Sequence, residues 1–165
     1  MLHLTVLFCT VSVVVRVDAA LIDESVYHTI ISTWREISSD AEHRLRDKFD
    51  EILRRLGRDT NLLYMERSDS IAVYISCMSP LAVMGLHYQY QTEQLRDFIQ
   101  SLFDFLLQAN QEIHVSGLRR IFQSLRTLFS RTKQTAYVHT LSWPPNDYDS
   151  CLDFFSSVPG LHNLK

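Results

Sequence analysis

The side chains that most often carry chemistry are scattered along this chain. Seven histidines are present, but no two stand at the i, i+4 spacing that aims two rings at one metal ion, and no Cys-x-x-Cys occurs. Ser130 and Lys133 match the Ser-x-x-Lys of penicillin-binding enzymes, without the further motifs of that class. The sequence also lacks a glycine-rich phosphate loop and a Gly-x-Ser-x-Gly elbow. We therefore expect a protein that is not an enzyme and that binds no metal or cofactor.

The clearest charge asymmetry lies in the last third of the sequence, where no acidic residue occurs between Ile113 and Asn146. The arginines and lysine of this stretch are Arg119, Arg120, Arg126, Arg131 and Lys133. One interpretation is a basic interaction face for an acidic protein, a membrane surface or nucleic acid. The other, which we favour, is the solvated face of an amphipathic helix over Leu118–Phe129. The chain is not basic overall and is not expected to interleave exposed aromatic residues with these charges, since its phenylalanines here fall on the apolar side of the predicted helix, so we expect no nucleic-acid partner.

Length and composition indicate one globular domain. A chain of 165 residues can bury a core without metal or disulfide bonds. With 46% hydrophobic and 21% charged residues and a net charge of −3, it does not have the composition of a disordered protein. Only four glycines and four prolines argue against a loop-rich or all-β fold. We expect a single domain over residues 21–160, followed by a frayed tail over residues 161–165.

The first twenty residues have two interpretations. Leu4–Val15 is an uncharged apolar run of twelve, shorter than the roughly 20 residues that a membrane helix needs, so we expect no stable membrane span. The run fits a signal peptide over residues 1–20, with Ala19 as the small residue at the cleavage site. Its start carries no lysine or arginine, and Arg16 lies just before that site, which is atypical of a signal peptide. The alternative is a buried N-terminal strand rich in β-branched residues, and both interpretations stay open.

The expected state of the cysteines depends on whether the N-terminal segment is cleaved. Cleavage after Ala19 would remove Cys9 and leave Cys77 and Cys151 as a pair that could bridge in a secreted protein. If the segment is retained, the three are buried thiols of a reducing compartment. No Asn-x-Ser/Thr glycosylation sequence occurs in the chain. We therefore favour buried thiols and a cytoplasmic location, with secretion as the alternative.

Apolar residues at helical spacing predict a first helix over Asp23–Ile37, interrupted by the short polar residues 38–40. Ser39 and Glu42 match a capping box, which predicts that a second helix begins there and continues to Leu56. Gly57 is the expected C-cap of this helix.

Strand patterns alternate with helical ones in the rest of the chain. Thr60–Glu66 and Ser70–Cys77 are predicted to form a hairpin, and Gln134–Trp143 a further strand that Pro144 ends. Between them, Ser79 and Pro80 predict a helix start. That helix is expected to reach about residue 108, with a break near residues 91–92, and its wide apolar stripe over residues 95–107 is expected to face the core. A last short helix, capped by residue 146 or 147, would follow Pro144.

These elements predict an α+β fold, a small, mostly antiparallel sheet packed against several amphipathic helices in a sandwich. The alternative is an all-α four-helix bundle, built from Asp23–Ile37 with Asp40–Leu56, Pro80–Gln108 and Leu118–Phe129. The strand patterns of Ser70–Cys77 and Gln134–Trp143 argue against it.

Three segments resemble the N-terminal domain of the TRADD adaptor and its animal relatives. The first is the strand Ser70–Cys77 with the helix start Ser79-Pro-Leu-Ala-Val-Met, and the second is Leu86-His-Tyr-Gln-Tyr90 with Leu95. The third is Val138-His-Thr-Leu-Ser142, followed by Tyr148-x-x-Cys151-Leu152. The resemblance covers roughly residues 60–157. It departs from the family at His87, where tryptophan is common, and at residues 92–93, where Ser-Gly or similar is usual.

The resemblance implies an α+β sandwich that makes protein–protein contacts in death-receptor or innate-immune signalling. It further implies TRAF-type partners and no enzymatic activity, and it transfers no contact residue to this chain. The alternative function, which goes with the four-helix bundle, is a secreted cytokine-like helical factor.

Overall fold

The strand β1 (Val11–Leu21) is built from alternating β-branched residues that point to opposite faces. The computed structural model of the protein describes residues 11–21, 24–67, 69–113 and 135–157. Val13, Val15 and Val17 are at most 1% exposed, whereas Ser12 and Arg16, on the other face, are exposed. The segment from Val11 onward is therefore a strand with one buried face, and residues 1–10 lie outside the described residues.

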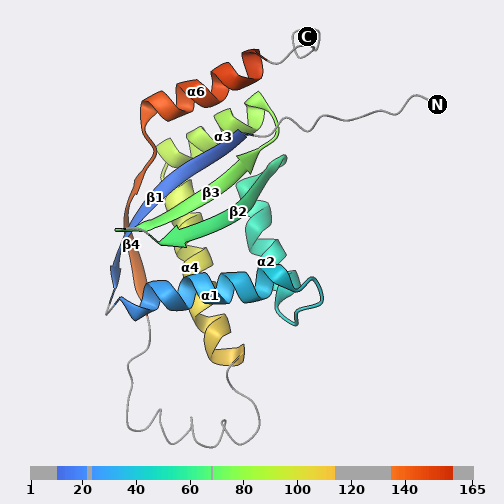
Figure 1. The fold of residues 1–165 in the computed structure, drawn as a ribbon, viewed down its shortest axis with the longest axis vertical. Helices are drawn as coiled ribbons and strands as arrows, with labels where there is room; N and C mark the ends of the chain where they lie inside the picture. Colours follow the sequence, from blue (N-terminus) through green and yellow to red (C-terminus); the bar gives the residue numbers. More distant parts are fainter. Residues whose placement is uncertain (1–10, 22–23, 68, 114–134, 158–165) are drawn as a thin grey trace, which may run out of the picture.

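The sheet has four strands in the order β2-β3-β1-β4, and each pair of neighbours is antiparallel (Figure 1). The other strands are β2 (Thr60–Arg67), β3 (Ile71–Cys77) and β4 (Ala136–Ser142). The predicted hairpin and the predicted late strand are both present, and the antiparallel sheet confirms the α+β class. The four-helix bundle alternative is wrong, because these segments are strands of one antiparallel sheet, with β3 buried along almost its whole length.

The helices cover one face of the sheet and its end. They are α1 (Ser25–Ser39), α2 (Arg46–Leu53), the 3-10 turn η1 (Arg54–Leu56), α3 (Pro80–Gln91), α4 (Gln94–Ile113) and α6 (Pro145–Ser156). In Figure 1, α4 runs behind the strands and crosses α1, whereas α3 and α6 lie together at the opposite end. This arrangement leaves the exposed side of β1 on the face of the sheet turned away from α4.

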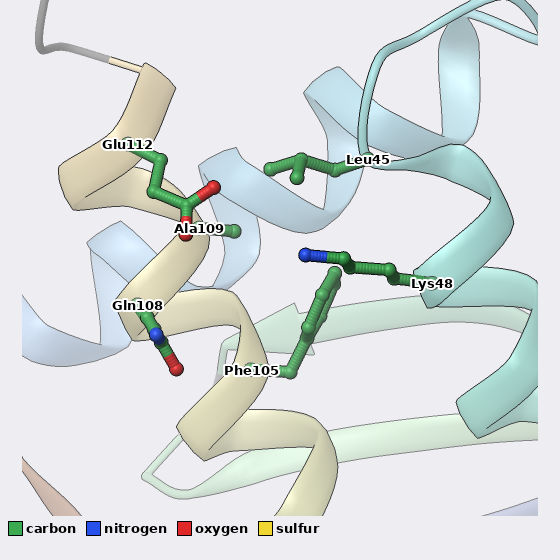
Figure 2. A pocket seen from close by; sticks show the side chains of 6 residues that line it. All are labelled: Leu45, Lys48, Phe105, Gln108, Ala109 and Glu112. Atoms are coloured by element: carbon green, nitrogen blue, oxygen red, sulfur yellow. The ribbon is translucent and has the colours of Figure 1, made fainter.

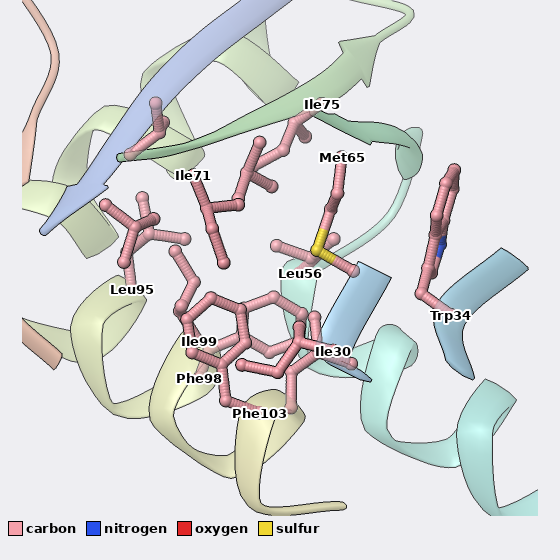
Figure 3. Packing of buried hydrophobic residues seen from close by; sticks show 14 of the residues in the cluster. Ile30, Trp34, Leu56, Met65, Ile71, Ile75, Leu95, Phe98, Ile99 and Phe103 are labelled. Atoms are coloured by element: carbon pink, nitrogen blue, oxygen red, sulfur yellow. The ribbon is translucent and has the colours of Figure 1, made fainter. Parts of the chain in front are cut away.

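The core forms where α4 meets the sheet and α1. Figure 3 shows Leu95, Phe98 and Ile99 of α4 directed toward Ile71 of β3, with Ile30 of α1 close by. All five side chains are at most 3% exposed. Burying one such side chain contributes roughly 1.5–3 kcal/mol to folding, so this contact supplies much of the driving force. The prediction that the wide apolar stripe of this helix faces the core is confirmed.

The start of the second helix differs from its prediction. Ser39 still belongs to α1, where its hydroxyl donates to the carbonyl of Glu36, so it caps nothing. Arg46 instead closes the end of α1, since its guanidinium donates to the carbonyls of Ile37 and Ser38 at 3.2 and 3.0 Å. The capping-box prediction is therefore wrong, and α2 begins only at Arg46. Gly57, at φ 105°, ends this region as predicted.

The helix start at Pro80 after β3 is as predicted, whereas α4 continues to Ile113, beyond the predicted end near residue 108. The predicted break near residues 91–92 is present, because α3 ends at Gln91 and Glu93 has a positive φ of 63° before α4 begins.

The last helix has no side-chain cap at its start: it begins at Pro145, with Pro144 as N-cap. Capping by residue 146 or 147 is therefore wrong.

The outer edge of β4 is closed by side chains from the helices. The amide of Gln100 donates to the carbonyl of Ala136 and accepts from the N–H of Val138, both at 2.8 Å. It thus replaces the hydrogen bonds that a further strand would make. The Tyr90 hydroxyl contacts backbone groups near the end of the same strand. An edge occupied in this way is protected from pairing with another chain.

The position of β1 leads to a first prediction. Val15→Asp places a carboxylate at a fully buried position of an inner strand, so we expect it to lower the free energy of unfolding by about 4 kcal/mol or more. Urea denaturation followed by circular dichroism measures the loss. The matched control is Ser12→Asp, on the exposed face of the same strand, which should change stability by less than about 0.5 kcal/mol. Equal effects of the two substitutions would contradict the described orientation of β1.

Candidate functional site

The basic residues singled out in the sequence lie outside the part of the chain that the structure describes. They are Arg119, Arg120, Arg126, Arg131 and Lys133, and the predicted helix Leu118–Phe129 falls in the same stretch. Their role as an interaction face therefore stays a prediction. The described residues offer another candidate on α3.

Helix α3 is held at its start by a side-chain cap. The Ser79 hydroxyl accepts a hydrogen bond from the N–H of Ala82 at 3.1 Å, and Pro80 occupies the first helical position, as the sequence predicts. The twelve residues of the helix, PLAVMGLHYQYQ, include no aspartate, glutamate, lysine or arginine. Helices at a protein surface normally carry charge on the side that faces water, so this composition is unusual for a helix with an exposed side.

The apolar residues of α3 fall on two opposite sides. Ala82, Val83 and Leu86 face the core and are at most 7% exposed. Leu81, Met84 and Tyr88 recur at helical spacing on the opposite side, where they are 77%, 49% and 60% exposed. Gly85 lies among them and is also exposed. We call the surface formed by Leu81, Met84, Gly85 and Tyr88 the α3 face.

Both flanks of α3 are fixed by contacts with neighbouring elements. On one flank the ring of His87 stacks on Tyr148 of α6, with centroids 3.7 Å apart and planes 13° apart. On the other, the Gln89 amide donates to the carbonyl of Leu56 at 3.2 Å. With the core beneath it, the helix is held on three sides. The α3 face is the fourth side and is presented in a fixed orientation.

An aromatic cluster joins α3 to α6 and to the end of β4. Trp143 is 3% exposed and makes edge-to-face contacts with His87, Tyr90 and Tyr148 at centroid distances of 5.3, 5.9 and 5.7 Å. Contacts of this kind add about 0.5–1.5 kcal/mol each beyond area burial. The indole Nε1 of Trp143 is buried without a hydrogen-bond partner among the described residues. The rings pack against one another, so the cluster is a structural anchor for α3.

A small cavity lies between α2 and α4 (Figure 2). It measures about 100 Å³ and is lined by Leu45, Lys48, Phe105, Gln108, Ala109 and Glu112. Figure 2 shows Lys48 reaching from α2 toward α4, with Phe105 below it. Sites for drug-sized molecules usually span roughly 300–1,000 Å³, so this cavity is too small for such a ligand.

A larger, more polar pocket of about 330 Å³ lies beside the α3–α4 turn and β4. Its lining residues are Tyr90, Gln91, Glu93, Arg96, His139, Thr140 and Leu141. The guanidinium of Arg96 is already paired with the carboxylate of Glu93 at 3.0 Å, so an anionic ligand would have to displace that carboxylate. The pocket therefore offers no ready anion site.

Cys77 and Cys151 are free, buried thiols, exposed by 0% and 6%. Burial raises the pKa of Cys77 from 9.0 to about 12, with a further contribution from nearby Cys151. Burial also raises the pKa of Cys151. A thiol acts as a nucleophile only as the thiolate, so the described cysteines are poorly suited to covalent chemistry at neutral pH.

The raised pKa of Cys77 predicts slow thiol chemistry. In a chain carrying Cys9→Ser and Cys151→Ser, Cys77 in the folded state should react with Ellman's reagent at pH 8 roughly a hundredfold more slowly than in guanidinium chloride. The folded-state rate should rise as pH increases above 8, because burial holds the pKa of Cys77 above its ordinary value and the thiolate fraction grows with pH. Equal rates for folded and unfolded chains at pH 8 would contradict the burial of this thiol.

The described residues contain no group of three or more histidine, cysteine, aspartate or glutamate side chains that could hold a metal ion. Within the same residues, no helix has both the length and the apolar character needed to cross a membrane. No family model, curated protein or solved structure matches this chain. The surface of the molecule and the chain's own motifs are therefore the features that bear on its function.

The α3 face was missed by sequence reasoning, which predicted this helix and placed the candidate interaction face elsewhere. The pattern that indicates it is the run of twelve residues without charge, apolar on both sides of the helix. Periodicity finds apolar sides but does not say which of two such sides the fold buries.

Proposed function

We propose that this protein is a non-enzymatic protein-interaction module and that the α3 face is one of its contact surfaces. The observation that carries the proposal is an uncharged helix with exposed Leu81, Met84 and Tyr88, held rigidly on its other three sides. Exposed apolar side chains that lie together on a soluble protein mark sites of association. Because the face is held in place, its ordering costs little free energy when a partner binds.

The chemistry of the α3 face favours a protein partner. Nucleic acids and anionic membrane surfaces are bound through lysine and arginine, which α3 lacks. A small molecule needs a concave site, whereas this surface is the outward side of a helix. Leucine, methionine and tyrosine are the side chains with which one protein buries another's apolar surface, and tyrosine and methionine are enriched at such interfaces.

The resemblance to the TRADD N-terminal domain supports the same class of function. The α+β sandwich with an antiparallel sheet that the resemblance implies agrees with the observed architecture. On that basis we propose death-receptor or innate-immune signalling as the setting and TRAF-type proteins as partners. The secreted cytokine-like alternative has less support, since the helical bundle that motivated it is absent and a sheet takes its place.

We also propose that the protein is cytoplasmic and keeps its first nineteen residues. Cleavage after Ala19 would remove most of β1, which pairs with both β3 and β4. Two free buried thiols fit a reducing compartment as well.

Mass spectrometry of the protein expressed in animal cells tests the cytoplasmic proposal. The expected result is an intact chain beginning near Met1 in the cytosolic fraction, because the fold uses residues on both sides of Ala19. A chain that begins near Ala20 and appears in the medium would overturn the cytoplasmic proposal and favour a secreted factor.

Photo-crosslinking tests the α3 face as a protein contact. A benzoylphenylalanine placed at Tyr88 in cells should give a discrete adduct with a protein, because that side chain would lie in an interface. The matched control is the same substitution at Tyr137 on β4, a tyrosine exposed to almost the same extent, 61% against 60%. Mass spectrometry of the adduct then identifies the partner and decides whether it is TRAF-type. Identical, diffuse labelling from the two positions would contradict the proposal.

A further inference from the structure

We propose that the α3 face binds the α3 face of a second copy of this chain, forming a weak two-fold dimer. The proposal rests on the proposed function, because it names the partner of the same surface. Charge, shape and size of the α3 face support it.

The absence of charge makes the α3 face compatible with itself. In a two-fold interface the same patch is present on both sides, so a charged residue near the axis would meet its own copy. Like charges brought together in this way oppose association. The α3 helix contains no aspartate, glutamate, lysine or arginine, so two copies can approach along the α3 face without such repulsion. A partner recognised through charge would find no complementary group here.

Large and small side chains on the α3 face are arranged so that two antiparallel copies fit. A two-fold axis passing between residues 84 and 85 sets Met84 of each copy opposite Gly85 of the other. The same axis sets Leu81 opposite Tyr88. A Cβ added at Gly85 would meet no atom within 4 Å, so the space above it is open to an incoming side chain. Methionine is flexible enough to fill such a gap, and a glycine at the crossing point lets the two helices approach closely.

The size of the α3 face limits the strength of the contact. The helix has twelve residues and is roughly 18 Å long. Three exposed side chains and a glycine cover much less than the roughly 800 Å² that each partner buries in a standard stable interface. The dimer is therefore of the weak, transient class, with a Kd in roughly the upper micromolar range.

Sedimentation equilibrium of the purified full chain, from about 5 to 500 µM, tests the dimer. The average mass of the unaltered protein should rise from the monomer toward the dimer value across this range. Met84→Glu should weaken self-association about tenfold or more, because it places like charges at the axis. The matched control is Leu63→Glu, which replaces an exposed side chain of nearly equal exposure on β2, 51% against 49%, and should change the Kd by less than about twofold.

A second variant separates loss of the interface from loss of the fold. Gly85→Leu puts a better helix former into open space, so its thermal midpoint should be unchanged or higher, while the added side chain obstructs the crossing point and weakens association about tenfold or more. Raising sodium chloride from about 0.1 to 1 M should not weaken the dimer, since no charge pair holds it.

Three results would overturn the dimer. They are a monomer at every concentration, a dimer that Met84→Glu and Gly85→Leu leave unchanged, and a dimer that dissociates in high salt. A purified chain that stays monomeric while position 88 crosslinks to a different protein in cells would overturn self-association and leave the proposed function standing. Absence of any protein adduct at position 88 would instead count against the proposed function itself.

Discussion

The structure depends on the insertion of β1 between β3 and β4. Without this strand the sheet would separate into a β2–β3 hairpin and an isolated β4, because β1 supplies the pairing on both sides. Val15 of β1 lies opposite Val73 of β3, which fixes the place of β3 in the sheet, and α3 follows β3 directly along the chain. On the other side the pairing places the end of β4, and with it Trp143, against α3 and α6. The position of α3 therefore follows from the pairing of β1.

The β4 edge of the sheet is covered by helix side chains, whereas the α3 face is exposed to solvent. At the β4 edge, Gln100 satisfies backbone groups of Ala136 and Val138, so polar groups that could attract another chain are already paired. On α3, apolar side chains remain exposed although the buried side of the same helix is well packed. The exposed apolar surface of α3, rather than the β4 edge, is therefore the site at which we propose association.

The sequence predicted local features well wherever one interaction decides the outcome. The alternation in Ile71–Cys77 and the cap at Ser79 were sufficient, since pleating and capping depend on neighbouring residues alone. The capping box at Ser39 failed because Ser39 remains in α1, whose last carbonyls accept from Arg46, eight and nine residues further along the chain. The exposure of Leu81 was beyond sequence reasoning for a similar reason. Which side of α3 is buried is set by tertiary contacts with α4 and with α6, and α6 is distant in the sequence.

The same contacts make folding and association separable on α3. The core beneath the helix, the His87–Tyr148 stack and the Gln89 hydrogen bond hold α3 in place, and none of them uses a side chain of the α3 face. A change at Met84 or Tyr88 therefore alters the surface that a partner meets while leaving these three anchors intact. In the free protein, the exposure of these apolar side chains to water is unfavourable in free energy. Covering the α3 face recovers part of that free energy, which favours association through this surface over an isolated chain.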